Sequence, residues 1–165
     1  MTSRLCQKRL RREIEMYSKE NFRFPNLILR PDDSNLLLWY FIVCDIKDTP
    51  YEGGYYFGKI NLPNEYPLKA PDFIFITPNG RFETNRKICT TFSAYHQDTY
   101  TSTWNVLTMM EGMISFMTED DKAGIGSITV SEAERRQLAQ KSVQWNTENV
   151  DFNRIFPDFL DLIKQ

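Results

Sequence analysis

Apolar residues recur at helical spacing near the start of the chain. Residues 3–19 contain good helix formers with no Gly or Pro, and Leu10, Ile14 and Tyr17 lie three or four positions apart. Ser3 stands at the beginning of this run and is a residue type that caps helix N-termini. We therefore expect an N-terminal helix over residues 3–19.

The next part of the chain holds four short runs that are rich in aromatic and β-branched residues. They predict strands at residues 27–29, 36–45, 55–61 and 73–76. Pro, Asp, Asn and Gly are concentrated between these runs, which is typical of turns. Four strands joined by short turns predict an antiparallel meander.

Residues 77–105 follow neither the helical nor the strand period. A connection of this length without secondary structure is uncommon inside a compact domain, and such loops are commonly functional. We therefore expect candidate chemistry in this long loop.

Helical spacing returns after residue 105. Five apolar residues fit one helical face: Val106, Met110, Met113, Ile114 and Met117. This face is either an adaptable methionine-rich binding surface or a core face, and we interpret it as core. A second helix is expected over residues 131–149, where Ser131 and Glu134 have the spacing of a capping box. A third apolar face runs from residue 152 to residue 163, and Pro157 must kink it or start a new helix.

The order of these elements predicts the fold class. A helix, four strands, a long loop and further helices indicate an α+β fold. The chain has 165 residues, of which 41% are hydrophobic and 14% aromatic, so it can bury one sizeable core. We expect a single domain over residues 1–165.

Charge is nearly balanced overall but is uneven along the chain. The 20 basic and 22 acidic residues give a net charge of −2, which argues against a nucleic-acid-binding protein. Basic residues gather in the N-terminal helix, where Arg4, Lys8, Arg11 and Arg12 are spaced along one side. This side is either a solvated helix face or a docking site for an acidic partner, and the pattern leaves both interpretations open.

Three cysteines and one histidine limit the possible sites. An odd number of widely spaced cysteines does not predict a disulfide framework, and a single histidine offers no zinc-ligand spacing, so we expect no metal site. A reducing compartment fits this composition.

The longest apolar run, residues 36–44, is too short for a membrane-spanning helix, which needs about 20 residues. Residues 1–20 lack the apolar stretch of a signal peptide.

Cys89 has the surroundings of a reactive thiol. Arg86 and Lys87 precede it and a run of Thr and Ser follows it, whereas Cys44 lies in an apolar strand and Cys6 on the basic helix. Nearby positive charge and partial exposure favour the thiolate, which is the nucleophilic form. A structural role for Cys89 is the alternative, and the sequence environment alone does not decide between them.

Two residues near Cys89 have side chains suited to acyl transfer. Asn79 lies ten residues earlier in a Pro-Asn-Gly turn, where it is either an ordinary turn residue or an amide donor for an oxyanion. His96 lies seven residues later and is the only candidate imidazole base, although it can equally be a loop histidine bonded to backbone. A cysteine hydrolase that uses Cys89 and His96 is a further alternative, but papain-like enzymes place the histidine much farther downstream.

Several motifs in this region resemble those of ubiquitin-conjugating enzymes. They are Thr49–Gly54, the proline loop Leu62–Pro71, Thr77-Pro78-Asn79 where the family has His-Pro-Asn, Ile88-Cys89 at the family's catalytic cysteine, and Trp104 after the active site. They occur in the family's order over most of residues 1–165. The resemblance therefore implies a ubiquitin-conjugating-enzyme-like fold, with the long loop as the active-site loop.

Finer details are similar to one branch of that family. Residues 77–82, a histidine shortly after the cysteine and residues 124–128 resemble the J-type enzymes of endoplasmic-reticulum-associated degradation. Members of that branch are held on the cytosolic face of the endoplasmic reticulum by a C-terminal membrane tail, which this sequence lacks. The resemblance therefore implies a cytosolic protein, or one at that face if the full-length protein carries an anchor.

The resemblance also implies a mechanism. Cys89 would accept ubiquitin as a thioester from the activating enzyme and pass it to a lysine. Asn79 would stabilise the oxyanion or hold the active-site loop, and His96 would assist transfer to Ser or Thr hydroxyls as a base. No cofactor is implied, because the activating enzyme consumes the ATP. A non-catalytic ubiquitin-pathway binding module on the same fold is the second interpretation, and the retained cysteine argues against it.

Partner contacts are carried over residue by residue. The basic residues Arg4, Lys8, Arg11 and Arg12 would meet the activating enzyme, and Leu68, Ser102 and Thr103 would meet a RING-type ubiquitin ligase. Tyr100 and Ser102 depart from the branch, which commonly has Trp and Pro there. A separate hypothesis is that Glu119, Asp120 and Asp121 orient or deprotonate the acceptor lysine, and a solvated acidic loop is the alternative.

Overall fold

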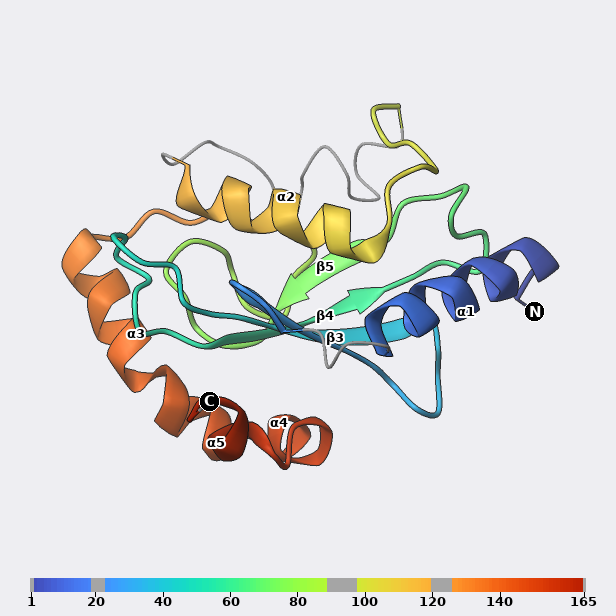
Figure 1. Ribbon diagram of the computed structural model, residues 1–165. Helices are drawn as coiled ribbons and strands as arrows, with labels where there is room; N and C mark the ends of the chain where they lie inside the picture. Colours follow the sequence, from blue (N-terminus) through green and yellow to red (C-terminus); the bar gives the residue numbers. More distant parts are fainter. Residues whose placement is uncertain (1, 19–22, 89–97, 120–125, 165) are drawn as a thin grey trace.

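Five antiparallel strands form one sheet whose spatial order follows the chain (Figure 1). The computed structural model describes residues 2–18, 23–88, 98–119 and 126–164. The strands are β1 (Arg23–Phe24), β2 (Leu27–Pro31), β3 (Leu38–Val43), β4 (Tyr56–Asn61) and β5 (Asp72–Phe75). The predicted meander is confirmed in β2 to β5, whose ends lie within two residues of the predicted ones. Strand β1 was not predicted, because two residues are too few to show alternation.

Two of the helices begin directly after the caps that the sequence predicts. They are α1 (Arg4–Ser18), α2 (Val106–Thr118), α3 (Glu132–Thr147), α4 (Val150–Ile155) and α5 (Phe159–Leu162). The Ser3 hydroxyl accepts a hydrogen bond from the Cys6 amide, and the Ser131 hydroxyl accepts one from the Glu134 amide, both at 3.1 Å. Pro157 lies between α4 and α5, as the restart of the helix requires. Among the described helices, none is both long and apolar enough to cross a membrane.

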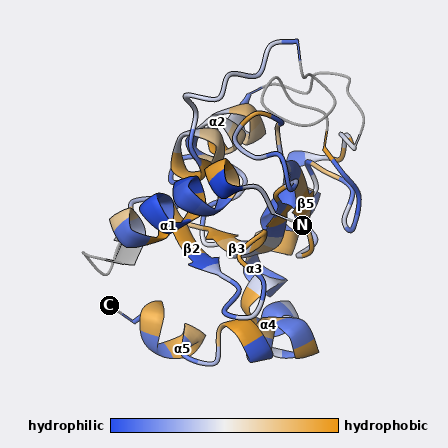
Figure 2. Ribbon diagram, turned by 90° about the vertical axis from the view of Figure 1, so that its right-hand side faces the viewer, coloured by the Kyte–Doolittle hydropathy of each residue, from blue (hydrophilic) through white to orange (hydrophobic). Residues whose placement is uncertain are grey.

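Helices cover both faces of the sheet, and β3 is buried between them (Figure 2). Trp39 and Phe41 point into a core shared with α1 and α2. Tyr40 and Ile42, on the opposite face, pack against α4 and α5. Burial on both faces explains why the sequence of β3 is continuously apolar rather than alternating.

The methionine-rich face of α2 is a core face, as interpreted from the sequence. Met109, Met110, Met113 and Met117 are all buried in the cluster that α2 shares with the sheet. The position of α2 over the sheet sets the end of the long loop, which enters α2 through Asn105. The Asn105 side chain caps α2 by accepting a hydrogen bond from the Thr108 amide at 2.8 Å.

Candidate active site

The structure describes part of the predicted site. Cys89, His96, Asp120 and Asp121 lie outside the described residues. The chain is described up to Ile88 and again from Asp98, so both ends of the predicted long loop, residues 77–88 and 98–105, are described.

The backbone that leads to Cys89 is attached to the sheet. Ile88 is buried, and its amide donates to the Phe73 carbonyl of β5 at 3.0 Å. Lys87 forms an isolated antiparallel bridge with Ile74 of β5. The ammonium of Lys87 also lies 3.2 Å from the carboxylate of Asp72.

The two cations before Cys89 are engaged with carboxylates. In addition to the Lys87–Asp72 pair, the guanidinium of Arg86 lies 2.6 Å from the carboxylate of Glu83. Both basic side chains are about half exposed. Their positive charge is therefore partly offset locally, which sequence proximity to Cys89 did not reveal.

Asn79 is buried and holds the turn in which it lies. Its side-chain amide donates to the Thr77 carbonyl at 3.0 Å, and its side-chain carbonyl accepts from the amides of Arg81 and Phe82, both at 2.8 Å. Gly80 has a φ of +79°, in the left-handed region that glycine adopts without strain. These contacts correspond to the loop-holding role, one of the two roles that the resemblance implied for Asn79.

The same turn is braced from a helix far along the chain. The buried hydroxyl of Thr77 donates to the side-chain carbonyl of Asn146 in α3 at 2.6 Å and accepts from the Phe57 amide at 2.9 Å. The side-chain amide of Asn146 donates to the Tyr55 carbonyl. Asn146 was not predicted from the sequence, because no local pattern relates residues 69 positions apart.

The residues predicted to meet a ligase lie on two loops that contact each other. Leu68 is 64% exposed in the proline loop, and Ser102 and Thr103 are exposed in the stretch before α2. The hydroxyl of Tyr100 donates to the Pro67 carbonyl at 2.7 Å, which joins the two loops. Burial raises the pKa of Tyr100 to about 12, so this hydroxyl stays protonated and able to donate well above neutral pH.

A buried ion pair on α1 contacts the loop of Ser102 and Thr103. Glu13 is 1% exposed and receives the guanidinium of Arg9 at 3.2 Å. The other nitrogens of Arg9 donate to the carbonyls of Ser102 and Trp104 at 2.9 and 2.8 Å. The only sequence signal for this pair is its four-residue spacing on a helix, which also occurs in many surface pairs.

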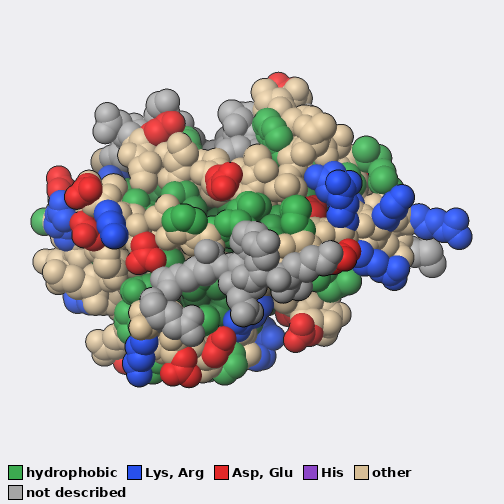
Figure 3. Space-filling view, viewed as in Figure 1, with side chains coloured by type: hydrophobic (Ala, Val, Ile, Leu, Met, Phe, Trp, Pro, Cys, Tyr) green, Lys and Arg blue, Asp and Glu red, His purple; other side chains and the backbone are tan. Residues whose placement is uncertain are grey.

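The basic side of α1 faces solvent. Arg4, Lys8, Arg11 and Arg12 are all exposed. Figure 3 shows Lys and Arg side chains gathered at the end of the molecule formed by α1. The structure leaves this surface open to an acidic partner, in contrast to Arg9, which turns inward.

Glu119 and the cysteines other than Cys89 are the remaining candidate residues. Glu119 is exposed at the C-terminal cap of α2. Cys44 is fully buried, as expected for a small apolar residue, and Cys6 is buried too. Burial raises the pKa of the Cys6 thiol. Within the described ranges, no three His, Cys, Asp or Glu side chains gather as metal ligands.

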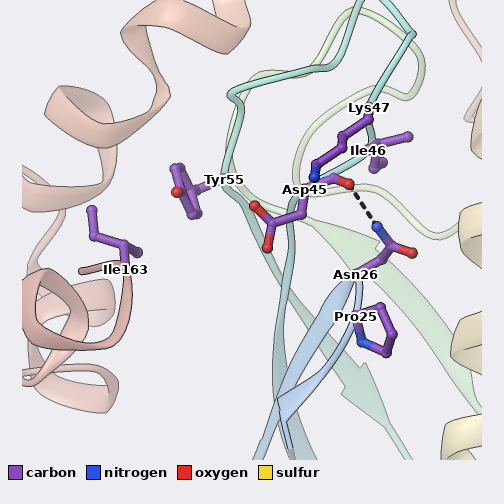
Figure 4. A pocket seen from close by; sticks show the side chains of 7 residues that line it. All are labelled: Pro25, Asn26, Asp45, Ile46, Lys47, Tyr55 and Ile163. Atoms are coloured by element: carbon purple, nitrogen blue, oxygen red, sulfur yellow. Dashed lines mark hydrogen bonds between the residues drawn. The ribbon is translucent and has the colours of Figure 1, made fainter. Parts of the chain in front are cut away.

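A pocket of about 700 Å³ opens at one end of the sheet (Figure 4). Its lining includes Asn26, Lys47, Tyr55 and Ile163, and the Asn26 side-chain amide donates to the Asp45 carbonyl at 2.8 Å. None of its lining residues belongs to the turn around Asn79 or to the loops of Leu68 and Ser102. The pocket is therefore separate from the described part of the candidate active site.

Comparisons with known proteins place these features in one family. Residues 9–146 match the ubiquitin-conjugating enzyme family. Ubiquitin-conjugating enzyme E2 6 of Candida glabrata is 40% identical over 162 residues, which are 98% of this chain and 65% of that protein. Ubiquitin-conjugating enzyme E2 J2 of Homo sapiens is 41% identical over 141 residues, which are 86% of this chain and 54% of that protein. The chain thus spans between about half and two thirds of the length of these relatives.

Proposed function

Because the chain belongs to the ubiquitin-conjugating enzyme family, in its J-type branch, we propose that it carries ubiquitin as a thioester on Cys89. The observation that carries this proposal is the family match over residues 9–146, which includes Cys89 and the turn of Asn79. The buried hydrogen bonds of that turn support a rigid frame next to the cysteine-bearing segment.

The reaction proposed is acyl transfer in two steps. The Cys89 thiolate attacks the carbonyl carbon of the ubiquitin glycyl group, and the cysteine of the activating enzyme leaves as a thiolate. A lysine amine of the acceptor then attacks the new thioester and loses a proton, and Cys89 leaves as a thiolate. Dividing the transfer in this way replaces one difficult step with two easier ones.

Two exposed surfaces suit the proposed partners. The basic side of α1 would bind an acidic surface of the activating enzyme through Arg4, Lys8, Arg11 and Arg12. A ubiquitin ligase of the RING type would bind Leu68, Ser102 and Thr103. We also propose a role in endoplasmic-reticulum-associated degradation, at the cytosolic face of that membrane, on the basis of the resemblance of residues 77–82 and 124–128 to the J-type branch.

A thioester-charging assay tests the central step. The chain is mixed with ubiquitin, activating enzyme and ATP, and the products are separated without reducing agent. We expect an ATP-dependent, thiol-sensitive adduct of one ubiquitin that disappears in Cys89→Ala and persists in the matched control Cys6→Ala. Absence of the adduct from folded wild-type protein would instead favour the non-catalytic binding module.

The role of His96 needs a separate comparison. A hydroxyl is a weaker nucleophile than a deprotonated amine and gains more from a general base near neutral pH. His96→Ala should therefore slow discharge of the Cys89 thioester to a serine peptide more than discharge to a lysine peptide. Equal losses on both peptides would contradict this role.

Neutralising Glu119, Asp120 and Asp121 together tests acceptor orientation, because only that role predicts slower transfer to lysine.

A further inference from the structure

Gly126 lies against the backbone that leads into Cys89. Its φ is +86°, in the left-handed region that favours glycine. A Cβ atom added there would lie 2.9 Å from the Lys87 carbonyl oxygen and 3.4 Å from the Cα atom of Ile88. A side chain at this position would therefore push the two backbones apart.

Hydrogen bonds hold Gly126-Ser127-Ile128, here called the 126–128 segment, against residues 81–83. The Glu83 amide donates to the Gly126 carbonyl at 2.7 Å, and the Ile128 amide donates to the Arg81 carbonyl at 3.0 Å. An antiparallel bridge joins the two segments between these bonds. The 126–128 segment is thus tied to the residues that follow the Asn79 turn.

Arg81 reinforces this attachment with a fully buried side chain. Its guanidinium lies 4.8 Å from the ring centre of Phe82 and 4.9 Å from that of Phe116. It donates to the Ser127 hydroxyl at 3.2 Å and to the Phe116 carbonyl at 3.4 Å. One side chain therefore connects the Asn79 turn, the end of α2 and the 126–128 segment.

The backbone at Lys87 and Ile88 is held from its other side by the sheet. Lys87 bridges Ile74, and the Ile88 amide donates to Phe73, both in β5. The residues immediately before Cys89 thus lie between β5 and the 126–128 segment. Contacts on two sides restrict their movement more than the sheet alone would.

We propose that Gly126 and Arg81 are positioning residues for Cys89. Gly126 allows the 126–128 segment to reach the backbone before the cysteine, and Arg81 holds the segment in place. Cys89 is bonded to Ile88, so a displacement of Ile88 is passed directly to the nucleophile. This inference rests on the proposed function, because it concerns the sulfur that would carry ubiquitin.

The chain provides a matched control for Gly126. Gly53 has a φ of +81°, and a Cβ added there meets nothing within 4 Å. Gly126→Ala and Gly53→Ala therefore both place an alanine at a similar positive φ, but only Gly126→Ala pushes on Lys87 and Ile88. A difference between these variants isolates the contact from the strain.

Thiol alkylation offers a readout that needs no activating enzyme. Cys6 and Cys44 are fully buried, so iodoacetamide applied to the folded protein reports on Cys89, and mass spectrometry confirms the labelled site. We expect Gly126→Ala to shift the pH profile of the alkylation rate, whereas Gly53→Ala keeps the wild-type profile. Charging with ubiquitin and discharge to free lysine should slow about tenfold or more in Gly126→Ala, because small displacements of reacting groups are costly.

Arg81→Lys keeps the inference testable if Gly126→Ala does not fold. Lysine retains the charge but cannot reach both Ser127 and Phe116 as the guanidinium does. A slowed discharge at an unchanged unfolding midpoint supports the positioning role. The inference is overturned if folded Gly126→Ala keeps wild-type rates and the wild-type alkylation profile. If Gly126→Ala is unfolded, the same result in Arg81→Lys overturns it. If wild-type protein forms no thioester, the proposed function fails, and the alkylation comparison still decides the positioning role.

Discussion

The carboxylate of Glu13 in α1 accepts a hydrogen bond from the amide of Val106, the first residue of α2, at 2.7 Å. The start of α2 carries unpaired amides and a partial positive charge, so a buried carboxylate is well placed there. Tyr66 also donates to Glu13, and Tyr17 accepts from the next amide of α2, that of Leu107, at 2.8 Å. Helix α1 therefore orients α2 together with the proline loop and the loop that precedes α2.

Removing this carboxylate should strongly destabilise the protein. Glu13→Ala leaves the buried donors of Arg9, Tyr66 and Val106 without their acceptor, and we expect a loss of about 3 kcal/mol in the free energy of unfolding. Urea unfolding followed by circular dichroism measures it. The matched control is Glu132→Ala, which removes an exposed pair with Arg136 at the same spacing and should cost less than about 1 kcal/mol. Equal losses in both variants would contradict the proposed importance of Glu13.

The ion pair between Arg30 and Asp158 should make stability depend on acid pH. Arg30 donates to both carboxylate oxygens, at 2.8 and 3.0 Å, and these hydrogen bonds lower the pKa of Asp158 below its ordinary value of 3.8. A depressed folded-state pKa gives stability that is present above the unfolded value and is lost as the pH falls through the folded value.

Asp158→Asn tests that dependence. Because both side chains are partly exposed, we expect a loss of at most about 1 kcal/mol at pH 7 relative to wild type. The difference in the free energy of unfolding between wild type and Asp158→Asn should shrink as the pH falls below about 4. Asp151→Asn is the control, since its carboxylate lies 3.9 Å from exposed Arg154. A free-energy difference that stays constant down to pH 2 would show that the ion pair is not its cause.

Tyr100 should contribute stability that is lost in alkali. Burial raises its pKa to about 12, so its contribution is fully present below the unfolded value of about 10 and is lost as the pH rises through about 12. Tyr100→Phe removes the hydrogen bond to Pro67 and should cost about 1 kcal/mol at pH 8. The difference in unfolding free energy from wild type should shrink between pH 10 and 12. A difference that grows over this range would contradict the assignment.

Leu68 should matter for transfer and not for stability. Its side chain is 64% exposed, so Leu68→Ala should change the free energy of unfolding by less than about 0.5 kcal/mol. Charging of Cys89 should stay normal, while acceleration of lysine discharge by a RING domain active on wild type should fall about tenfold. Leu160→Ala, at a 51% exposed position on α5, is the control and should retain that acceleration. Normal acceleration in Leu68→Ala would place the ligase contact elsewhere.

Features that depend on neighbouring residues were visible in the sequence. The caps Ser3 and Ser131, the break at Pro157 and the Asn79 turn each arise from side chains that act within a few positions. Strand β1 escaped prediction because its two residues show no period. The places of Cys89 and His96 relative to these elements stay predictions, since both residues lie outside the described ranges.

The sequence by itself determined the order of helices and strands, the meander and the family motifs, because period, turn chemistry and local caps are properties of short segments. Only the tertiary structure decided that Glu13 caps α2, that Asn146 braces Thr77 and that Gly126 touches the backbone before Cys89. These residues are far apart along the chain. They meet because folding buries polar side chains and backbone groups, and each buried polar group needs a specific hydrogen-bond partner.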